Sequence, residues 1–253
     1  MTAATRAEVC VVACAEAWRG DGAILASPMG TIPTLGARLA KATFAPDLLI
    51  SDGEAYLLGS IPPVGPSDHE PVVEGWLPFR SVFDLVARGR RHVMMGASQI
   101  DRFGNQNISA IGDPRRPKVQ LLGARGAPGN TINHATSYWV PAQSARVFVE
   151  RVDVVTGVGY DRAAAAGDEA TRYHEIRVVV TDLAVYDFET EDHSMRVRSI
   201  HPGVDAEAVA AASAFALPGL DDAAVTRAPD DDELRLIRDV LDPHDLRVQE
   251  VAA

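Results

Sequence analysis

Two glycine clusters lie within one stretch of the chain, residues 96–133. The first is Gly96-Ala97-Ser98-Gln99, and the second runs from Gly123 through Gly126 to residue 129. Glycines bring backbone N–H groups close to a ligand, but they also permit sharp turns. Each cluster follows an apolar run typical of a strand, at residues 93–95 and 119–122. Either cluster alone fits a simple loop, whereas the repetition favours a binding function.

Polar side chains in the same stretch are candidate ligand contacts. The amides of Gln99, Asn105 and Asn130 have the capacity to bind a substrate, and equally to satisfy the backbone of their own turns. Arg125 is a permanent cation in a glycine-rich loop, where it suits a carboxylate or phosphate unless it is an exposed loop-tip residue. His134 is a candidate acid–base group, although a lone histidine is more often structural.

Two carboxylates, Asp52 and Glu54, follow the apolar run at residues 48–51. Carboxylates at the end of a strand act as bases, nucleophiles or hydrogen-bond acceptors. The two side chains share one side of an extended chain, but not necessarily of a tight turn. A pair of solvated loop acids is the alternative interpretation.

Composition limits the class of protein. The chain has 253 residues, 47% of them hydrophobic, and a net charge of -11, which argues against nonspecific nucleic-acid binding. Basic clusters at residues 88–91 and 115–118 leave room for a local phosphorylated ligand. No apolar run reaches the roughly 18 residues of a membrane span, and no secretory signal begins the chain, so we expect a cytoplasmic protein. Cys10 and Cys14 fit buried free thiols, and no spacing matches a metal site.

Hydrophobic periodicity predicts helices at residues 5–18, 34–43, 81–88, 205–214 and 230–241, and strands at residues 23–26, 48–51, 91–95, 177–181, 184–188 and 195–200. The proline-rich segment 58–76 and the polar segment 157–171 are expected to be loops. This alternation predicts an α/β fold with an open, mostly parallel sheet and helices on both faces. Ligands bind such sheets at the carboxyl ends of strands, where Asp52 and Glu54 stand. No linker marks a boundary, so a single domain is expected over residues 1–253.

Several stretches resemble, in order, the β subunits of class I CoA-transferases, including glutaconate CoA-transferase. They are residues 30–33, 45–47, 99–107, 109–113, 117–118, 123–130, 180–182 and 241–243. The resemblance covers nearly the whole chain. It implies the CoA-transferase (NagB/RpiA-like) fold and a related α subunit, commonly in an α2β2 assembly with the active site between subunits. It also implies an acyl-CoA substrate, held by glycine-loop N–H groups, and no cofactor beyond that coenzyme A.

The chain departs from that family at two places. The family has Glu-Ser-Gly or Glu-Asn-Gly after the second strand, and its glutamate attacks the thioester. Here the residues are Ser51-Asp52-Gly53-Glu54, so that Asp52 takes the place of the glutamate one methylene short, or Glu54 takes it after a shift. A shortened arm is a serious defect for covalent catalysis, which needs closely placed atoms. Arg125 adds a cation to the glycine loop.

These departures resemble one subgroup, the β subunits of actinobacterial steroid-degrading hydrolases. The resemblance implies hydrolytic opening of the last cholesterol-derived ring, carried as a cyclic β-oxo acyl-CoA with a propionate side chain. Arg125 would then orient a carboxylate or enolate. The carboxylate that activates water is Asp52, Glu54 or a residue of the α subunit. A CoA-transferase β subunit and a noncatalytic scaffold are the alternatives.

Overall fold

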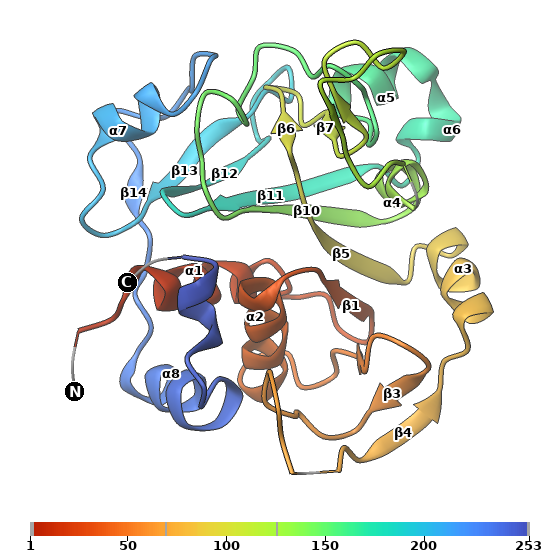
Figure 1. The fold of residues 1–253 in the computed structure, drawn as a ribbon, viewed down its shortest axis with the longest axis vertical. Coiled ribbons are helices and arrows are strands. Elements are labelled where there is room, and N and C mark those ends of the chain that lie inside the picture. The colour runs from red at the N-terminus through yellow and green to blue at the C-terminus, as the bar shows by residue number, and fades with distance from the viewer. Residues whose placement is uncertain (1–2, 69, 125, 252–253) are drawn as a thin grey trace. The chain divides into compact units, whose positions relative to one another are not determined.

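The computed structural model describes residues 3–68, 70–124 and 126–251. The chain forms two compact units. Figure 1 labels their helices and strands. Unit 1 joins the chain up to Met94 with the segment from Thr226 onward, and unit 2 spans Met95–Val225. The expectation of one domain over residues 1–253 therefore stays a prediction.

The strands of unit 1 form two groups. Strand β1 (Leu25–Pro28) pairs in parallel with β5 (Arg91–Gly96), with Leu25 opposite Arg91. The short strands β2 (Ile50–Ser51), β3 (Tyr56–Leu58) and β4 (Val73–Trp76) form an antiparallel sheet in that order. A parallel bridge between Leu25 and Leu49 links β1 to the segment entering β2. The carboxyl ends of β1 and β2 therefore lie near each other, as parallel strands require.

Helices α1 (Arg6–Glu16) and α2 (Thr31–Ala42) pack on each other in unit 1. Thr5 begins α1 in a reciprocal capping box with Glu8. Gly36 lets the helices approach closely, because a Cβ there would lie 2.8 Å from the Cβ of Cys14. Three helical segments complete the unit: α3 (Phe79–Ala87), α8 (Asp231–Arg235), which continues into the π-helical segment η1 (Leu236–Leu241), and the 3-10 turn η2 (Leu246–Gln249).

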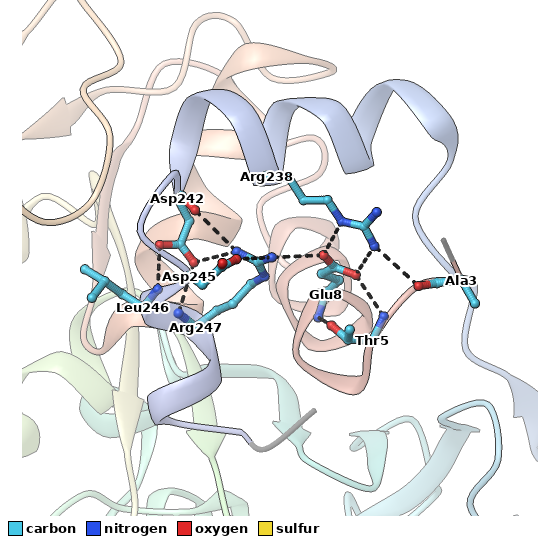
Figure 2. A network of polar contacts seen from close by, with 8 residues as sticks. All are labelled: Ala3, Thr5, Glu8, Arg238, Asp242, Asp245, Leu246 and Arg247. Atoms are coloured by element: carbon cyan, nitrogen blue, oxygen red, sulfur yellow. Dashed lines mark hydrogen bonds and ion pairs between the residues drawn. The ribbon is translucent and has the colours of Figure 1, made fainter. Parts of the chain in front are cut away.

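A buried ionic network ties the start of the chain to its end (Figure 2). The Glu8 carboxylate accepts from Arg238 Nε at 2.7 Å and from Arg247 Nη2 at 3.1 Å. Arg247 Nη1 also donates to the Asp242 carboxylate at 2.9 Å. Because Glu8, Asp242 and Arg247 are all buried, each needs these partners to offset its lost hydration.

The main sheet of unit 2 has the order β10 (Ala135–Val140), β11 (Glu175–Thr181), β12 (Ala184–Asp187), β13 (Arg196–Ile200) and β14 (Ala224–Val225). The β10–β11 and β13–β14 pairs are parallel, and the two pairs between them are antiparallel. Two short hairpins, β6 (Gln99–Ile100) with β7 (Gln106–Asn107) and β8 (Ala110–Ile111) with β9 (Val119–Gln120), precede it.

Short helices lie toward the two ends of the unit 2 sheet (Figure 1). They are α4 (Ala127–Asn133), α5 (Tyr160–Ala166), α6 (Asp168–Thr171) and α7 (Ala206–Ala211). In Figure 1, α7 lies on the side of β14 and the others lie on the opposite side. Helix α4 leads directly into β10 and contacts both β10 and β11. The second glycine cluster therefore lies beside the N-terminal end of β10.

The α/β fold class with a mixed, mostly parallel central sheet is confirmed, whereas the β2–β3–β4 sheet and the short hairpins are antiparallel. The prediction of loops was wrong in part for two segments. Residues 58–76 contain β4, because the prolines stop at residue 71 and leave Val73–Trp76 free to pair. Residues 157–171 contain α5 and α6, since the alanine run at residues 163–166 favours a helix. The helix predicted to start at Ser81 begins two residues earlier, at Phe79.

Candidate functional site

A cavity of about 510 Å³ opens in unit 1 beside the carboxyl ends of β1 and β2. Helix α2 and the start of α3 contribute to its wall. Its lining combines an apolar part with four ionisable side chains, those of Arg38, Asp52, Glu54 and Arg91. A concave site with an apolar wall and a few convergent polar groups is the usual form of a small-molecule site. The cavity is therefore the candidate site of this unit.

Two guanidinium groups line this cavity. Arg91 is the first residue of β5. Its Nε donates to the hydroxyl of Ser27 on the neighbouring parallel strand β1 at 2.8 Å. Arg38 projects from α2, and its Nη1 is buried without a hydrogen-bond partner. Burial lowers the pKa of both Arg38 and Arg91, although an arginine remains charged at neutral pH. The cavity thus contains fixed positive charge within a partly apolar enclosure.

Asp52 caps the turn that follows β2. Its Oδ1 accepts from the backbone N–H groups of Glu54, Ala55 and Tyr56 at 2.9, 2.9 and 3.0 Å. Desolvation raises the pKa of Asp52, but these backbone donors, led by Tyr56, hold the pKa below its ordinary value. The side chains of Asp52 and Glu54 are both exposed. Asp52 is therefore an ionised group committed to its own turn, which suits a structural function or an electrostatic one.

Gln99 and Asn105 are buried in unit 2 and form hydrogen bonds within the protein. Gln99 donates to Asp153 at 3.0 Å and accepts from Asn107 at 2.7 Å. Asn105 donates to Asp161 at 2.7 Å, and its oxygen accepts from Gly159 N at 2.8 Å. These contacts fix the β6–β7 hairpin that follows the first glycine cluster. They show what these amides bind inside the chain, and substrate contact by either stays a prediction.

The predicted glycine-loop residues lie in two places in unit 2, before β6 and before α4. Gly96 is exposed at the end of β5, Ala97 and Ser98 are half-buried, and Ser98 N donates to Asn107 O at 3.0 Å. Gly123 has a φ of +88°, which glycine adopts without strain, and Gly126 precedes α4. Arg125, the sharpest of the sequence predictions, lies outside the described residues.

Asn130 and His134 lie together at the end of α4. His134 Nε2 is 3.3 Å from Asn130 Oδ1, and His134 Nδ1 is 2.9 Å from the Ala135 carbonyl oxygen. Both side chains are buried. The pair therefore joins α4 to the first residues of β10, and its contact with a substrate stays a prediction.

The structure brings Asp52 and Glu54 together in one cavity of unit 1, whereas the other predicted site residues that it describes belong to unit 2. Arg38 was not among the residues predicted from the sequence. The sequence did contain a signal for it, a single charge within the apolar helical run at residues 35–40. An arginine on the apolar side of a helix is unusual unless its charge has a partner. Ser27 carried no such signal, because its contact with Arg91 comes from strands 64 residues apart.

The described residues contain no group of three histidine, cysteine, aspartate or glutamate side chains arranged to hold a metal ion. None of the helices in the described ranges combines the length and apolar composition that a membrane span requires. Cys10 and Cys14 are both buried thiols, as the sequence indicated.

Comparison with known proteins identifies the family. The chain is 55% identical over 252 residues to the cholesterol ring-cleaving hydrolase IpdB subunit of Rhodococcus jostii RHA1, covering 100% of this chain and 98% of that one. The chain belongs to the IpdB family. The crystal structure of Rhodococcus jostii RHA1 IpdAB matches it with a TM-score of 0.95 over 100% of both chains. No protein-family model matches the sequence.

More distant relatives confirm the resemblance to CoA-transferases. The chain is 30% identical to the β subunit of 3-oxoadipate CoA-transferase from Pseudomonas knackmussii, over 94% of both chains. Glutaconate CoA-transferase from Acidaminococcus fermentans shares the fold, with a TM-score of 0.82 at 24% identity and 98% coverage of both chains. The chain therefore has the CoA-transferase fold, as its sequence motifs indicated.

Proposed function

We propose that this chain is the β subunit of a heteromeric hydrolase that opens the last ring of a steroid degradation intermediate. The substrate is a cyclic β-oxo acyl-CoA, and the partner is a CoA-transferase-like α subunit in an α2β2 assembly. The observation that carries the proposal is the 55% identity to an IpdB subunit along the whole chain. The complex works in the cytoplasm and needs no cofactor beyond the coenzyme A of its substrate. Within the complex, this chain is a single-domain β subunit.

The proposed reaction adds water across one carbon–carbon bond. The oxygen of water attacks the ring ketone, and the bond from that carbon to the carbon beside the thioester breaks. The electron pair remains on that second carbon as a thioester enolate, which then takes a proton. The former ketone becomes a carboxylate. Preorganised donors at the developing negative charge are the main requirement for such a step.

The chain's own residues divide the work as follows. N–H groups of the two glycine clusters, other than those such as Ser98 N and Gly123 N that already donate within the chain, stabilise the oxyanion. Arg125 orients the enolate or carboxylate. A carboxylate activates the water. Asp52, Glu54 and a glutamate of the α subunit are the candidates, and the commitment of Asp52 to its turn favours the other two.

Labelled water tests the reaction. The reconstituted complex is incubated with the cyclic acyl-CoA in water enriched in oxygen-18, and the product is analysed by mass spectrometry. We expect one labelled oxygen in the new carboxylate and coenzyme A still attached. An unopened ring, or free coenzyme A as the main product, contradicts the proposal. Asp52→Asn and Glu54→Gln variants in the same assay decide between the candidate bases in this chain.

A CoA-transferase function is the second candidate, supported by the 30% identity to a 3-oxoadipate CoA-transferase subunit. Asp52 or Glu54 would then be the nucleophile and carry coenzyme A as a thioester. Borohydride reduces such a thioester to an alcohol. Detection of that alcohol in this chain after exposure to acyl-CoA would favour the transferase. If Arg125→Ala leaves kcat/KM unchanged, the chain is instead a scaffold for its partner.

A further inference from the structure

Arg38 is a cation that the proposed reaction does not use. It stands in the second half of α2, in the apolar run at residues 35–40, and lines the unit 1 cavity. Its Nη1 is buried and makes no hydrogen bond to the protein. A buried donor of a charged group that lacks an acceptor is costly, so a native site retains one for a reason. The most direct reason is an acceptor that arrives with a ligand.

The other charges in the cavity do not neutralise Arg38. Among the lining residues only Asp52, Glu54 and Arg91 also ionise. Asp52 Oδ1 is engaged by three backbone donors, and Glu54 is exposed. Desolvation lowers the pKa of Arg38, and within the described ranges no carboxylate forms an ion pair with it. The second guanidinium, that of Arg91, adds to the attraction for an anion.

The remaining wall indicates what carries that anion. Leu77, Phe79 and Val82 line the same cavity and offer an apolar surface. A volume of about 510 Å³ suits a ring-sized molecule. A phosphate is strongly hydrated and gains nothing from an apolar wall, whereas a carboxylate on a hydrocarbon skeleton satisfies both parts. The planar fork of a guanidinium also matches a carboxylate with two parallel hydrogen bonds.

We propose that the unit 1 cavity binds a carboxylate of the acyl-CoA substrate or product through the Arg38 guanidinium, with the attached apolar skeleton against Leu77, Phe79 and Val82. The identity of the acid rests on the proposed function, but the carboxylate site does not. Two sources supply the group in the proposed reaction. One is the propionate side chain, present before and after hydrolysis, and the other is the carboxylate that ring opening creates.

Direct binding tests the site without any turnover. The reconstituted complex is titrated calorimetrically with 3-cyclohexylpropionate, its neutral amide and inorganic phosphate. We expect the acid to bind and the amide and phosphate to bind at least about tenfold more weakly, since a hydrogen bond to a charged group contributes roughly 1.5–3 kcal/mol. Equal binding of acid and amide overturns the proposal, and so does a preference for phosphate.

Variants locate the binding in the cavity. Arg38→Met keeps much of the length and the apolar stem of the side chain, and we expect it to weaken binding of the acid about 10- to 100-fold. Arg38→Lys keeps the charge but loses the fork, so its affinity should fall between the two. The matched control is Arg88→Met, at the exposed end of α3, which should bind as the wild type does. Unchanged affinity in a folded Arg38→Met variant overturns the proposal.

Chemical protection decides the matter should Arg38→Met not fold. Phenylglyoxal modifies accessible arginines, and peptide mass spectrometry reports the extent at each one. In the wild-type complex the acid should slow modification of Arg38 and leave Arg88 unaffected. Equal modification of Arg38 with and without the acid overturns the proposal.

Kinetic measurements distinguish the propionate from the new carboxylate as the bound group. They also distinguish failure of the carboxylate site from failure of the proposed function. If the propionate is bound, Arg38→Met raises KM for the substrate and the inhibition constant of the product by similar factors. If the new carboxylate is bound, only the product is affected. Either result supports the carboxylate site. A complex that binds the acid through Arg38 but never opens the ring would remove the proposed function and leave this site intact.

Discussion

At the scale of single residues, Glu8 joins two distant parts of the chain through one buried carboxylate. Its carboxylate is 0% exposed and caps Thr5 N while pairing with two arginines from the far end of the chain (Figure 2). Removing one partner of a buried ion pair leaves the other charge without that compensation, and Arg247 would then keep only Asp242 and Asp245. Glu8 therefore stabilises both the start of α1 and the docking of the C-terminal segment.

We expect Glu8→Gln to destabilise the folded chain by about 3–5 kcal/mol, because Arg238 and Arg247 lose their shared carboxylate. Denaturant unfolding followed by circular dichroism measures the change. The control is Glu175→Gln, which removes a half-exposed pair with Arg177 and should change stability by less than about 1 kcal/mol. Equal effects of the two substitutions would contradict this account of the network.

The same carboxylate predicts an acid-dependent loss of stability. Burial raises the pKa of Glu8, but hydrogen bonds from Arg238 and Thr5 and the charges of Arg238 and Arg247 lower it from 4.5 to about 2. A depressed folded-state pKa means that the stabilisation is complete above about pH 4.5 and disappears as the pH falls toward 2. The stability difference between wild type and Glu8→Gln should therefore shrink across that interval. A difference that stays constant from pH 5 to about pH 2 would refute the assignment.

At the scale of elements, the closeness of α1 and α2 depends on one missing side chain. A Cβ on Gly36 would lie 2.8 Å from Cys14 Cβ and 2.9 Å from Ala15 N, and the second of these atoms is backbone that cannot rotate away. We expect Gly36→Ala to lower the free energy of unfolding by about 1–3 kcal/mol through overpacking. Gly129→Ala in α4 is the control, since its Cβ meets nothing closer than 3.9 Å and a helical alanine is favourable. Thermal unfolding of both variants checks the contrast.

The elements also show how far the sequence reaches. Helices α1 and α2 and strands β5, β11 and β12 were predictable, because their apolar periodicity and turn residues agree with their burial. Strand β10 was not, although all six of its residues are buried. Thr136 and Ser137 interrupt its apolar pattern, and its pairing with β11, some 40 residues later, is not visible in the local sequence.

The candidate site was predictable only where its residues are neighbours in the chain. Asp52 and Glu54 stand out because they end an apolar run. Arg38 becomes a site residue only when α2 packs beside β1 and β2, a long-range arrangement that no local pattern contains. The capping of the turn by Asp52 was likewise hidden, since the sequence fits an extended chain and a turn equally well.

At the scale of the whole molecule, unit 1 exposes large aromatic side chains. We call the side chains of Trp76, Phe79 and Phe83 the aromatic patch; they are 73%, 74% and 60% exposed, respectively. Phe79 and Phe83 pack edge to face with a centroid distance of 5.3 Å, and α3, which carries them, has no buried residue. A pair of packed, exposed aromatic rings such as Phe79 and Phe83 marks an interaction site more often than a free surface. Phe79 also lines the cavity, so a protein that covers the patch would close the cavity as well.

We expect the proposed α subunit to cover the aromatic patch, because Phe79 belongs both to the patch and to the cavity lining. We expect Phe83→Asp, which leaves the cavity lining unchanged, to weaken assembly about 10- to 100-fold by placing a charge in a desolvated contact. Analytical ultracentrifugation of titrated subunits measures the affinity. Val225→Asp, at a residue 73% exposed in unit 2, is the matched control. If Phe83→Asp assembles as tightly as the control, the partner does not cover the patch, and hydrogen exchange at residues 76–87 should then be the same in the free chain and in the complex.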